Sequence, residues 1–210
     1  MIGIVSRIRW LLCFVVMLAP GLSLAGTILV LGDSISAGYG LENLERGWVG
    51  LLQQRLQQTH ADWSIVNASI SGDTSAGGLA RVDDLLQRHA PGVVILELGG
   101  NDGLRGLPPA RLKENLTGII ARCRAAGAKV LLVGMRIPPN YGRRYTELFE
   151  GVFPQVAAEQ KADFVPFLLD GVGGNRSLMQ GDGLHPNGEA QPVMMDLVWQ
   201  KLVPLLKAPK

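Results

Sequence analysis

The stretch that most constrains this chain is an apolar run that leads to a serine. Residues 27–31 (Thr-Ile-Leu-Val-Leu) show no polar alternation, which is typical of a strand covered on both faces, as in a parallel sheet. Gly32 ends the run, so Ser34 follows the carboxyl end of the first strand, where open α/β sheets place their ligand sites. A reactive hydroxyl could stand there. The simpler interpretation is a turn whose serine caps a helix.

The same succession of apolar run, glycine-rich turn and helical stretch recurs along the chain. Apolar spacing predicts a helix between Gly47 and His60 and another that stops before Pro91, and Pro108-Pro109 opens a long helix that ends near Gly127. Further strands are expected at 63–68, 93–98, 129–134 and 162–166, and further helices near 145–161 and 189–206. Strands that alternate with helices predict an α/β fold, namely a three-layer α/β/α sandwich around a flavodoxin-like parallel sheet of about five strands.

The first 25 residues are expected to be a secretory signal peptide. Arg7 and Arg9 precede an apolar run, Pro20-Gly21 breaks that run, and the small residues that follow fit cleavage after Ala25. A retained membrane anchor is the alternative, but the run is shorter than the ~20 residues that a spanning helix needs. Residues 26–210 are then one predicted domain, expected in the periplasm or outside the cell.

Charge and cysteine content limit the partners of the mature domain. Without Arg7 and Arg9, 18 basic residues are balanced by 18 acidic ones, so the sequence offers no basic stripe for nucleic acid and no polybasic segment for stable membrane contact. Cys13 lies in the predicted signal peptide, which leaves Cys123 alone and precludes an internal disulfide. Cys123 shares the apolar face of its helix, which indicates a core residue rather than a nucleophile. We expect a monomer that acts on a small molecule.

Four polar turns follow strand ends or the late loop and can therefore converge on one rim of the sheet. They carry Ser34, Gly72, Asn101, and Asp182 together with His185. A serine hydroxyl needs a base to take its proton, and histidine is the usual base near neutral pH. Asp182-Gly-Leu-His185-Pro is a tight turn that can bring the carboxylate back to one imidazole nitrogen, which would orient and stabilise the ring. The other two histidines occupy ordinary surface settings: His60 and His89.

The predicted catalytic residues are therefore Ser34, Asp182 and His185, and two further turns supply donors for the oxyanion. Gly72 lets a backbone N–H approach closely, and the Asn101 amide donates while remaining neutral. With the backbone N–H of Ser34 they would form an oxyanion hole in which each donor contributes roughly 3 to 4 kcal/mol. Taken alone, Gly72 is more simply a turn and Asn101 a helix cap.

The sequence gives weaker signals for the residues that contact the substrate than for the catalytic residues. The apolar segment that starts at Leu104 and the loop from Ile137 and Pro138 to Tyr141 favour an acyl chain. The predicted enzyme is a serine hydrolase without a metal or other cofactor. A metallophosphoesterase also uses Asp, Asn and His on strand-end loops, but its two metals need several histidines. A noncatalytic sugar- or lipid-binding protein would have no reason to keep serine, histidine and oxyanion donors together.

These blocks resemble the SGNH hydrolases, also called the GDSL lipase/esterase family, over nearly the whole mature chain. The serine block is 32–36 (GDSIS), the glycine block 71–73 (SGD), the asparagine block 99–102 (GGND) and the final block 182–186 (DGLHP). Ile35 stands where the family name has leucine, an apolar exchange at a noncatalytic place. Residues 135–142 (MRIPPNYG) and the signal peptide resemble a periplasmic group of thioesterases, arylesterases and lysophospholipases. The resemblance implies an esterase with acyl thioesters, aryl esters or lysophospholipids as substrates; a carbohydrate deacetylase is the alternative on the same fold.

Overall fold

The sheet of this computed structural model is built outward from β1 (Gly26–Gly32), whose residues 28–31 are fully buried. The structure describes residues 26–206, so the predicted signal peptide and its cleavage site lie outside the described residues. The other strands are β2 (Trp63–Asn67), β3 (Val93–Glu97), β4 (Lys129–Val133) and β5 (Asp163–Val165). All pair in parallel in the order β2-β1-β3-β4-β5. This is the flavodoxin-like order, which confirms the predicted fold.

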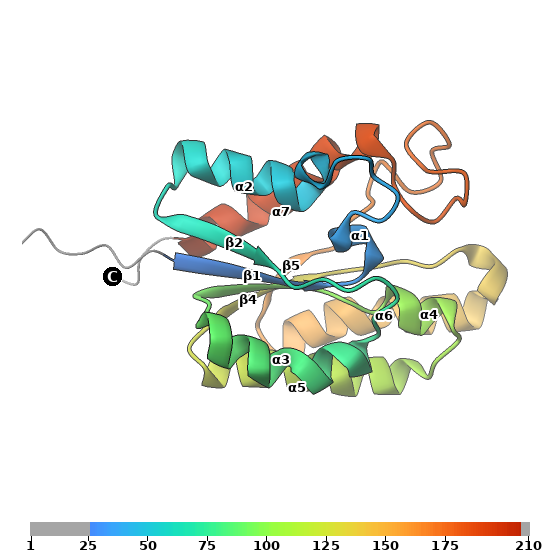
Figure 1. Cartoon of the computed structure of the whole chain (residues 1–210). Coiled ribbons are helices and arrows are strands. Elements are labelled where there is room, and N and C mark those ends of the chain that lie inside the picture. The colour runs from blue at the N-terminus through green and yellow to red at the C-terminus, as the bar shows by residue number, and fades with distance from the viewer. Residues whose placement is uncertain (1–25, 207–210) are drawn as a thin grey trace, which may run out of the picture.

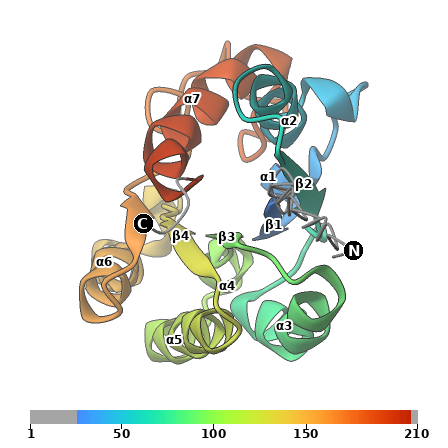
Figure 2. The same cartoon turned by 90° about the vertical axis from the view of Figure 1, so that its left-hand side faces the viewer.

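Helices cover both faces of the sheet (Figures 1 and 2). α2 (Trp48–Thr59) and α7 (Gln191–Leu202) lie on one face, and α3 (Ser75–His89), α5 (Pro109–Ala125) and α6 (Arg143–Glu159) lie on the other. Local chemistry sets several of their ends. The Thr74 hydroxyl accepts the Gly77 N–H at the start of α3, and Pro109 occupies the first turn of α5, where its missing N–H costs nothing.

The structure differs from the predicted elements at several ends. Two short helices, α1 (Ser34–Ala37) and α4 (Gly100–Leu104), stand where only turns were expected, and α6 starts two residues before Tyr145, after Gly142 at φ 87°. The predicted closing helix is α7 flanked by 3-10 turns at Gly188–Ala190 and Val203–Leu206, because Pro204 has no N–H with which to continue the helix. Further 3-10 turns lie at Leu44–Arg46 and Pro139–Tyr141.

The strand order reverses between β1 and β3, and this places the candidate site. β1 connects to β2 on one side and pairs with β3 on the other, so the loops that leave β1 and β3 diverge. A crevice opens at such a switch point, beyond the carboxyl ends of the strands. Gly32 is the register partner of Glu97, so the Ser34 turn and the Asn101 turn emerge side by side. Among residues 26–206 there is no helix with the length and hydrophobicity that a bilayer crossing requires.

Candidate active site

Ser34 is the first residue of α1, directly after the buried β1 strand. The turn is held by Asp33, whose Oδ1 accepts the Ile35 N–H at 3.1 Å and so caps α1. Gly38, at φ 77°, ends the helix after one turn. The nucleophile candidate is therefore fixed on a short rigid element at the rim of the sheet rather than on a free loop.

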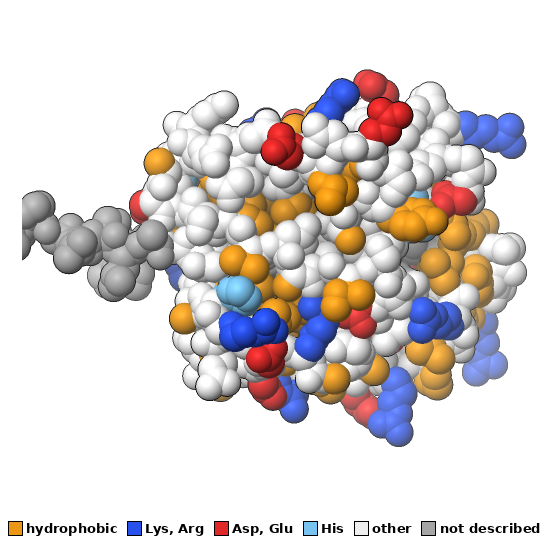
Figure 3. All heavy atoms as spheres, in the orientation of Figure 1, with side chains coloured by type: hydrophobic (Ala, Val, Ile, Leu, Met, Phe, Trp, Pro, Cys, Tyr) orange, Lys and Arg blue, Asp and Glu red, His pale blue; other side chains and the backbone are white. Residues whose placement is uncertain are grey.

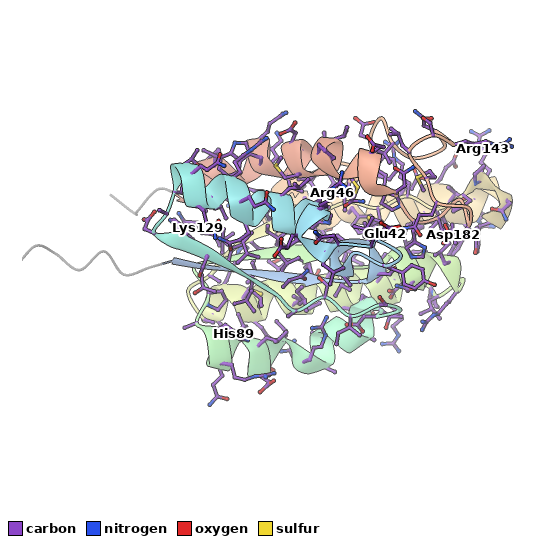
Figure 4. The ribbon with its side chains drawn as sticks, turned by 45° about the horizontal axis from the view of Figure 1, so that its top comes forward. Glu42, Arg46, His89, Lys129, Arg143 and Asp182 are labelled. Atoms are coloured by element: carbon purple, nitrogen blue, oxygen red, sulfur yellow. The ribbon has the colours of Figure 1, made fainter. Side chains whose placement is uncertain are left out.

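The late loop brings Asp182 and His185 to this serine. Oδ1 of Asp182 accepts the N–H groups of Leu184 and His185 at 2.9 and 3.0 Å, which closes the turn that the sequence predicts. Oδ2 of Asp182 lies 2.6 Å from His185 Nδ1, and His185 Nε2 lies 2.9 Å from Ser34 Oγ. The predicted catalytic residues form one chain of hydrogen bonds across 151 positions of sequence. Figure 4 shows Asp182 at the end of the sheet toward which the strands run.

Neighbouring contacts hold the His185 loop in place. The Gln180 N–H donates to the His185 carbonyl at 2.7 Å, and the Gln180 side chain donates to the carbonyls of Tyr39 and Pro186 at 2.8 and 3.0 Å. The Tyr39 ring lies against the imidazole with centroids 4.6 Å apart. Neither Gln180 nor Tyr39 was singled out from the sequence, because no local pattern distinguishes them from other polar or aromatic loop residues.

The environment of Asp182 keeps its carboxylate ionised. Partial burial pushes the pKa of Asp182 upward, but hydrogen bonds from the backbone and the ring of His185 and from the Leu184 N–H outweigh this and lower the pKa to about 2. An ionised carboxylate at Nδ1 fixes the imidazole tautomer whose Nε2 faces the serine and is free to accept a proton.

The other two histidines lie away from this site. His60 Nδ1 contacts the Thr59 hydroxyl at 2.9 Å, and the ring packs edge-on against Trp199. His89 ends α3 at the opposite end of the sheet from Asp182 (Figure 4). Within residues 26–206, no group of three or more His, Cys, Asp and Glu side chains is arranged to hold a metal ion.

The predicted oxyanion donors lie around the same cavity as Ser34. Gly72 adopts φ +80°, a left-handed conformation that L side chains rarely adopt. Asn101 lies in α4, and its amide nitrogen donates to the Asp73 carbonyl at 2.9 Å and to Asp33 Oδ2 at 3.2 Å. Both residues line the cavity at Ser34. The Asn101 amide is thus held at the cavity by the Asp73 carbonyl, and its longer contact is the one to Asp33.

The buried carboxylate of Asp102 holds the start of α4 against the start of α3. The side chain of Asp102 accepts the N–H of Ser75 at 2.8 Å and its hydroxyl at 2.5 Å, which ties the Asn101 turn to the start of α3 just after the Gly72 turn. Asp102 belongs to the asparagine block at 99–102, but the sequence predicts no role for it. Its position next to Asn101 was the only available signal.

A cavity of about 310 Å³ opens beside the Ser34 hydroxyl. Its walls are mainly apolar, and Figure 3 shows hydrophobic side chains gathered at this end of the molecule. Three of the four predicted substrate contacts line it: Leu104, Ile137 and Pro138. Tyr141 does not line it, because its hydroxyl donates to the carbonyl of Leu104, the last residue of α4, at 2.9 Å.

With this geometry in place, the chain can be compared with known proteins. The model of the GDSL-like lipase/acylhydrolase family matches residues 30–191, which include every residue of the hydrogen-bonded chain. The chain belongs to this family. It is therefore a hydrolase of ester or thioester bonds, which confirms the predicted family and class of enzyme.

Relatives of the chain match along most of their length. Esterase TesA of Pseudomonas aeruginosa is 54% identical over 194 residues, which cover 92% of this chain and 96% of that protein. Thioesterase 1/protease 1/lysophospholipase L1 of Escherichia coli is 44% identical over 200 residues, or 94% of each chain. A crystal structure of TesA has a TM-score of 0.83 with 56% identity, and covers 85% of this chain and 99% of that chain.

Asp33 is a second carboxyl at the site, directly before Ser34, and the sequence pattern predicts no role for it. It is 2% exposed, and this burial raises its pKa to about 6. The Ile35 N–H, the charge of His185 and the Asn101 amide act in the opposite direction, and Asp73 adds to the rise. The signal was present in the sequence as the residue before the serine, but its burial follows only from the packing of the turn against β3.

Proposed function

We propose that this acylhydrolase works through an acyl-enzyme on Ser34. The observation that carries the proposal is the pair of contacts that join Ser34 Oγ to His185 Nε2 at 2.9 Å and His185 Nδ1 to Asp182 Oδ2 at 2.6 Å. This is the arrangement that a serine hydrolase needs, namely a nucleophile within reach of a base and a carboxylate that orients the base.

In the acylation step, Ser34 Oγ attacks the carbonyl carbon of the substrate while His185 Nε2 takes the hydroxyl proton. The carbonyl π bond becomes the C–O⁻ of a tetrahedral intermediate, which the N–H groups of Ser34 and Gly72 and the amide of Asn101 stabilise. Collapse re-forms the carbonyl and breaks the bond to the alcohol or thiol, which leaves with the proton from the imidazolium. Asp182 stays ionised throughout.

Deacylation repeats these steps with water as the nucleophile. His185 takes a proton from water as its oxygen attacks the acyl carbon, and the second tetrahedral intermediate uses the same donors. On collapse the proton returns to Ser34 Oγ and the free acid departs. Among the residues of the site, only Ser34 and His185 change protonation state during the cycle.

The acyl group is proposed to lie in the apolar cavity. Ile137, Pro138 and Leu184 also line a neighbouring cavity of about 350 Å³ with mainly apolar walls, which is proposed to hold the far end of a longer chain. Acyl thioesters, aryl esters and lysophospholipids therefore fit the site. The apolar lining favours such substrates over an acetylated carbohydrate, whose sugar would require many hydrogen-bond partners.

The predicted location and assembly belong to the same proposal. We propose that residues 1–25 direct export and are removed after Ala25, so that the enzyme works in the periplasm or outside the cell. That it works as a monomer is a separate prediction. The residue pattern of the N-terminus supports this, with its two arginines, apolar run and small residues.

A panel of p-nitrophenyl esters and acyl-CoAs of increasing chain length tests the proposal on residues 26–210. We expect hydrolysis of both classes by the wild type and loss of at least ~10³-fold in kcat for Ser34→Ala, with an unchanged melting temperature. Ser177→Ala is the matched control, since Ser177 is exposed on the loop near Asn175. Full activity of Ser34→Ala would refute the proposed nucleophile.

A further inference from the structure

Glu97 is a fully buried carboxyl that the proposed mechanism does not use. It ends β3, and its side chain fits beneath the Ser34 turn because its register partner, Gly32, has no Cβ. A Cβ on Gly32 would lie 2.7 Å from Glu97 Oε2 and 2.8 Å from the Ser36 hydroxyl, closer than real contacts allow. The glycine before the nucleophile turn thus makes the space that this carboxyl fills.

A single oxygen of Glu97 contacts both sides of the nucleophile. Oε2 accepts the backbone N–H of Asp33 at 3.3 Å and the hydroxyl of Ser36 at 2.5 Å. Asp33 immediately precedes Ser34, and Ser36 follows it by two positions within α1. If Ser34 is the nucleophile proposed above, we propose that Glu97 is its positioning residue, a neutral clamp that holds the backbone on either side of the attacking hydroxyl.

The clamp is neutral because the negative charge lies on Asp33. Complete burial and the neighbouring Asp33 carboxylate raise the pKa of Glu97 well above its usual range. Asp33 ionises first, since it receives N–H donors from Ile35 and Asn101 and the attraction of His185. Because Oε2 accepts both contacts, the proton of the neutral carboxyl lies on Oε1, which has no hydrogen-bond partner among the described residues. An unpartnered neutral O–H at full burial costs much less free energy than an unpartnered ionised oxygen.

The charges near this pair extend to α3. Asp73 faces Asp33 and is itself paired with Arg81 at 2.8 Å, and the Arg81 guanidinium also lies 3.5 Å from the Gly32 carbonyl. A second negative charge under Ser34 would oppose the charge that develops on the substrate oxygen. A protonated carboxyl provides hydrogen bonds at this position without that opposition.

The test measures kcat, KM and the rate of fluorophosphonate labelling of Ser34 from pH 6 to 9. Glu97→Gln should keep kcat within about threefold and leave the pH profile unmoved, because the amide is neutral and nearly isosteric. Glu97→Ala should lower kcat and the labelling rate by about tenfold or more and leave KM within about twofold. A displacement of the reacting hydroxyl by less than 1 Å is enough for a loss of this size in rate. Ser36→Ala, which removes one arm, should lower kcat severalfold.

Controls separate positioning from folding and from the proposed function. Leu116→Ala, in the buried face of α5, should lower the melting temperature without lowering kcat at 25 °C. If Glu97→Ala fails to fold, the test rests on Ser36→Ala. An unchanged kcat in Ser36→Ala would then refute the proposal that Glu97 positions Ser34. A loss in Glu97→Gln as large as in Glu97→Ala, or a shifted pH profile, would show that the charge is needed and overturns the neutral assignment. Labelling at a residue other than Ser34 would instead refute the proposed nucleophile.

Discussion

Replacement of Asn101 by alanine isolates the contribution of one oxyanion donor. The Asn101 amide donates to the Asp73 carbonyl at 2.9 Å and, over a longer distance, to Asp33 Oδ2 at 3.2 Å. The second N–H is the one available to a substrate oxygen at the cavity. Loss of one such donor costs about 3 to 4 kcal/mol in the transition state, or about 10²- to 10³-fold in kcat. KM should change little, because the hydrogen bond strengthens as charge develops.

The assay is steady-state hydrolysis of a p-nitrophenyl ester by Asn101→Ala at a temperature well below its melting point. Asn115→Ala is the matched control: its amide donates to the Ser75 hydroxyl at 2.9 Å, close to the same turn but outside the cavity. That variant should lose about 1 kcal/mol of stability and keep its kcat. A rise in KM alone for Asn101→Ala would show that Asn101 binds the ground state and that the oxyanion hole is elsewhere.

Three further predictions concern the proposed catalytic residues, the buried Asp33 carboxyl and the N-terminus of the exported protein. His185→Ala should cost nearly as much kcat/KM as Ser34→Ala, because the two residues act as one unit; the double variant of Ser34 and His185 should lose no more than either single variant, and additive losses would contradict this. Asp182→Asn should cost less, because the carboxylate only orients and stabilises the imidazole. Asp33 binds more protons in the folded than in the unfolded chain between its ordinary pKa of 3.8 and its raised value of about 6, so Asp33 alone should lower folding stability by about 3 kcal/mol as the pH rises through that window, and Glu97, whose pKa is also raised, acts in the same direction. Urea unfolding of Asp33→Asn should show a shallower fall, and an identical slope would refute the buried charge. Mass spectrometry of the exported protein should find Gly26 at the N-terminus, and an intact Met1 in the membrane fraction would mean an anchored enzyme.

The architecture was accessible from the sequence because buried parallel strands leave a strong local pattern. Continuous apolar runs, such as those at 27–31 and 93–98, are typical of strands covered on both faces. The glycines that follow these runs mark the carboxyl-end rim of the sheet. The one-turn helices α1 and α4 were missed because four or five residues carry no helical periodicity. Their helical form depends on Asp33 and on the packing of the rim rather than on local preference.

In the candidate site, too, the sequence predicts contacts within one turn but not contacts that depend on the packing of distant segments. Asp182 and His185 lie three residues apart, so their contact is a property of a local turn, and the pattern predicts it. Tyr141 was placed at the cavity because it shares a loop with Ile137, but loop membership does not fix where a ring points, and its hydroxyl binds the Leu104 carbonyl instead. Glu97 was overlooked because a glutamate at the end of an apolar strand resembles a solvent-exposed boundary residue until its register with Gly32 is known.

Active-site labelling tests the central claim most directly. The purified mature protein is treated with a fluorophosphonate probe, digested, and mapped by peptide mass spectrometry, with His185→Ala as the comparison. The account predicts a single adduct on Ser34 in the wild type and labelling slowed by orders of magnitude in the variant, because the probe requires the serine to lose its proton to the imidazole. An adduct on Cys123 or on another serine, or equal labelling with and without His185, would contradict it.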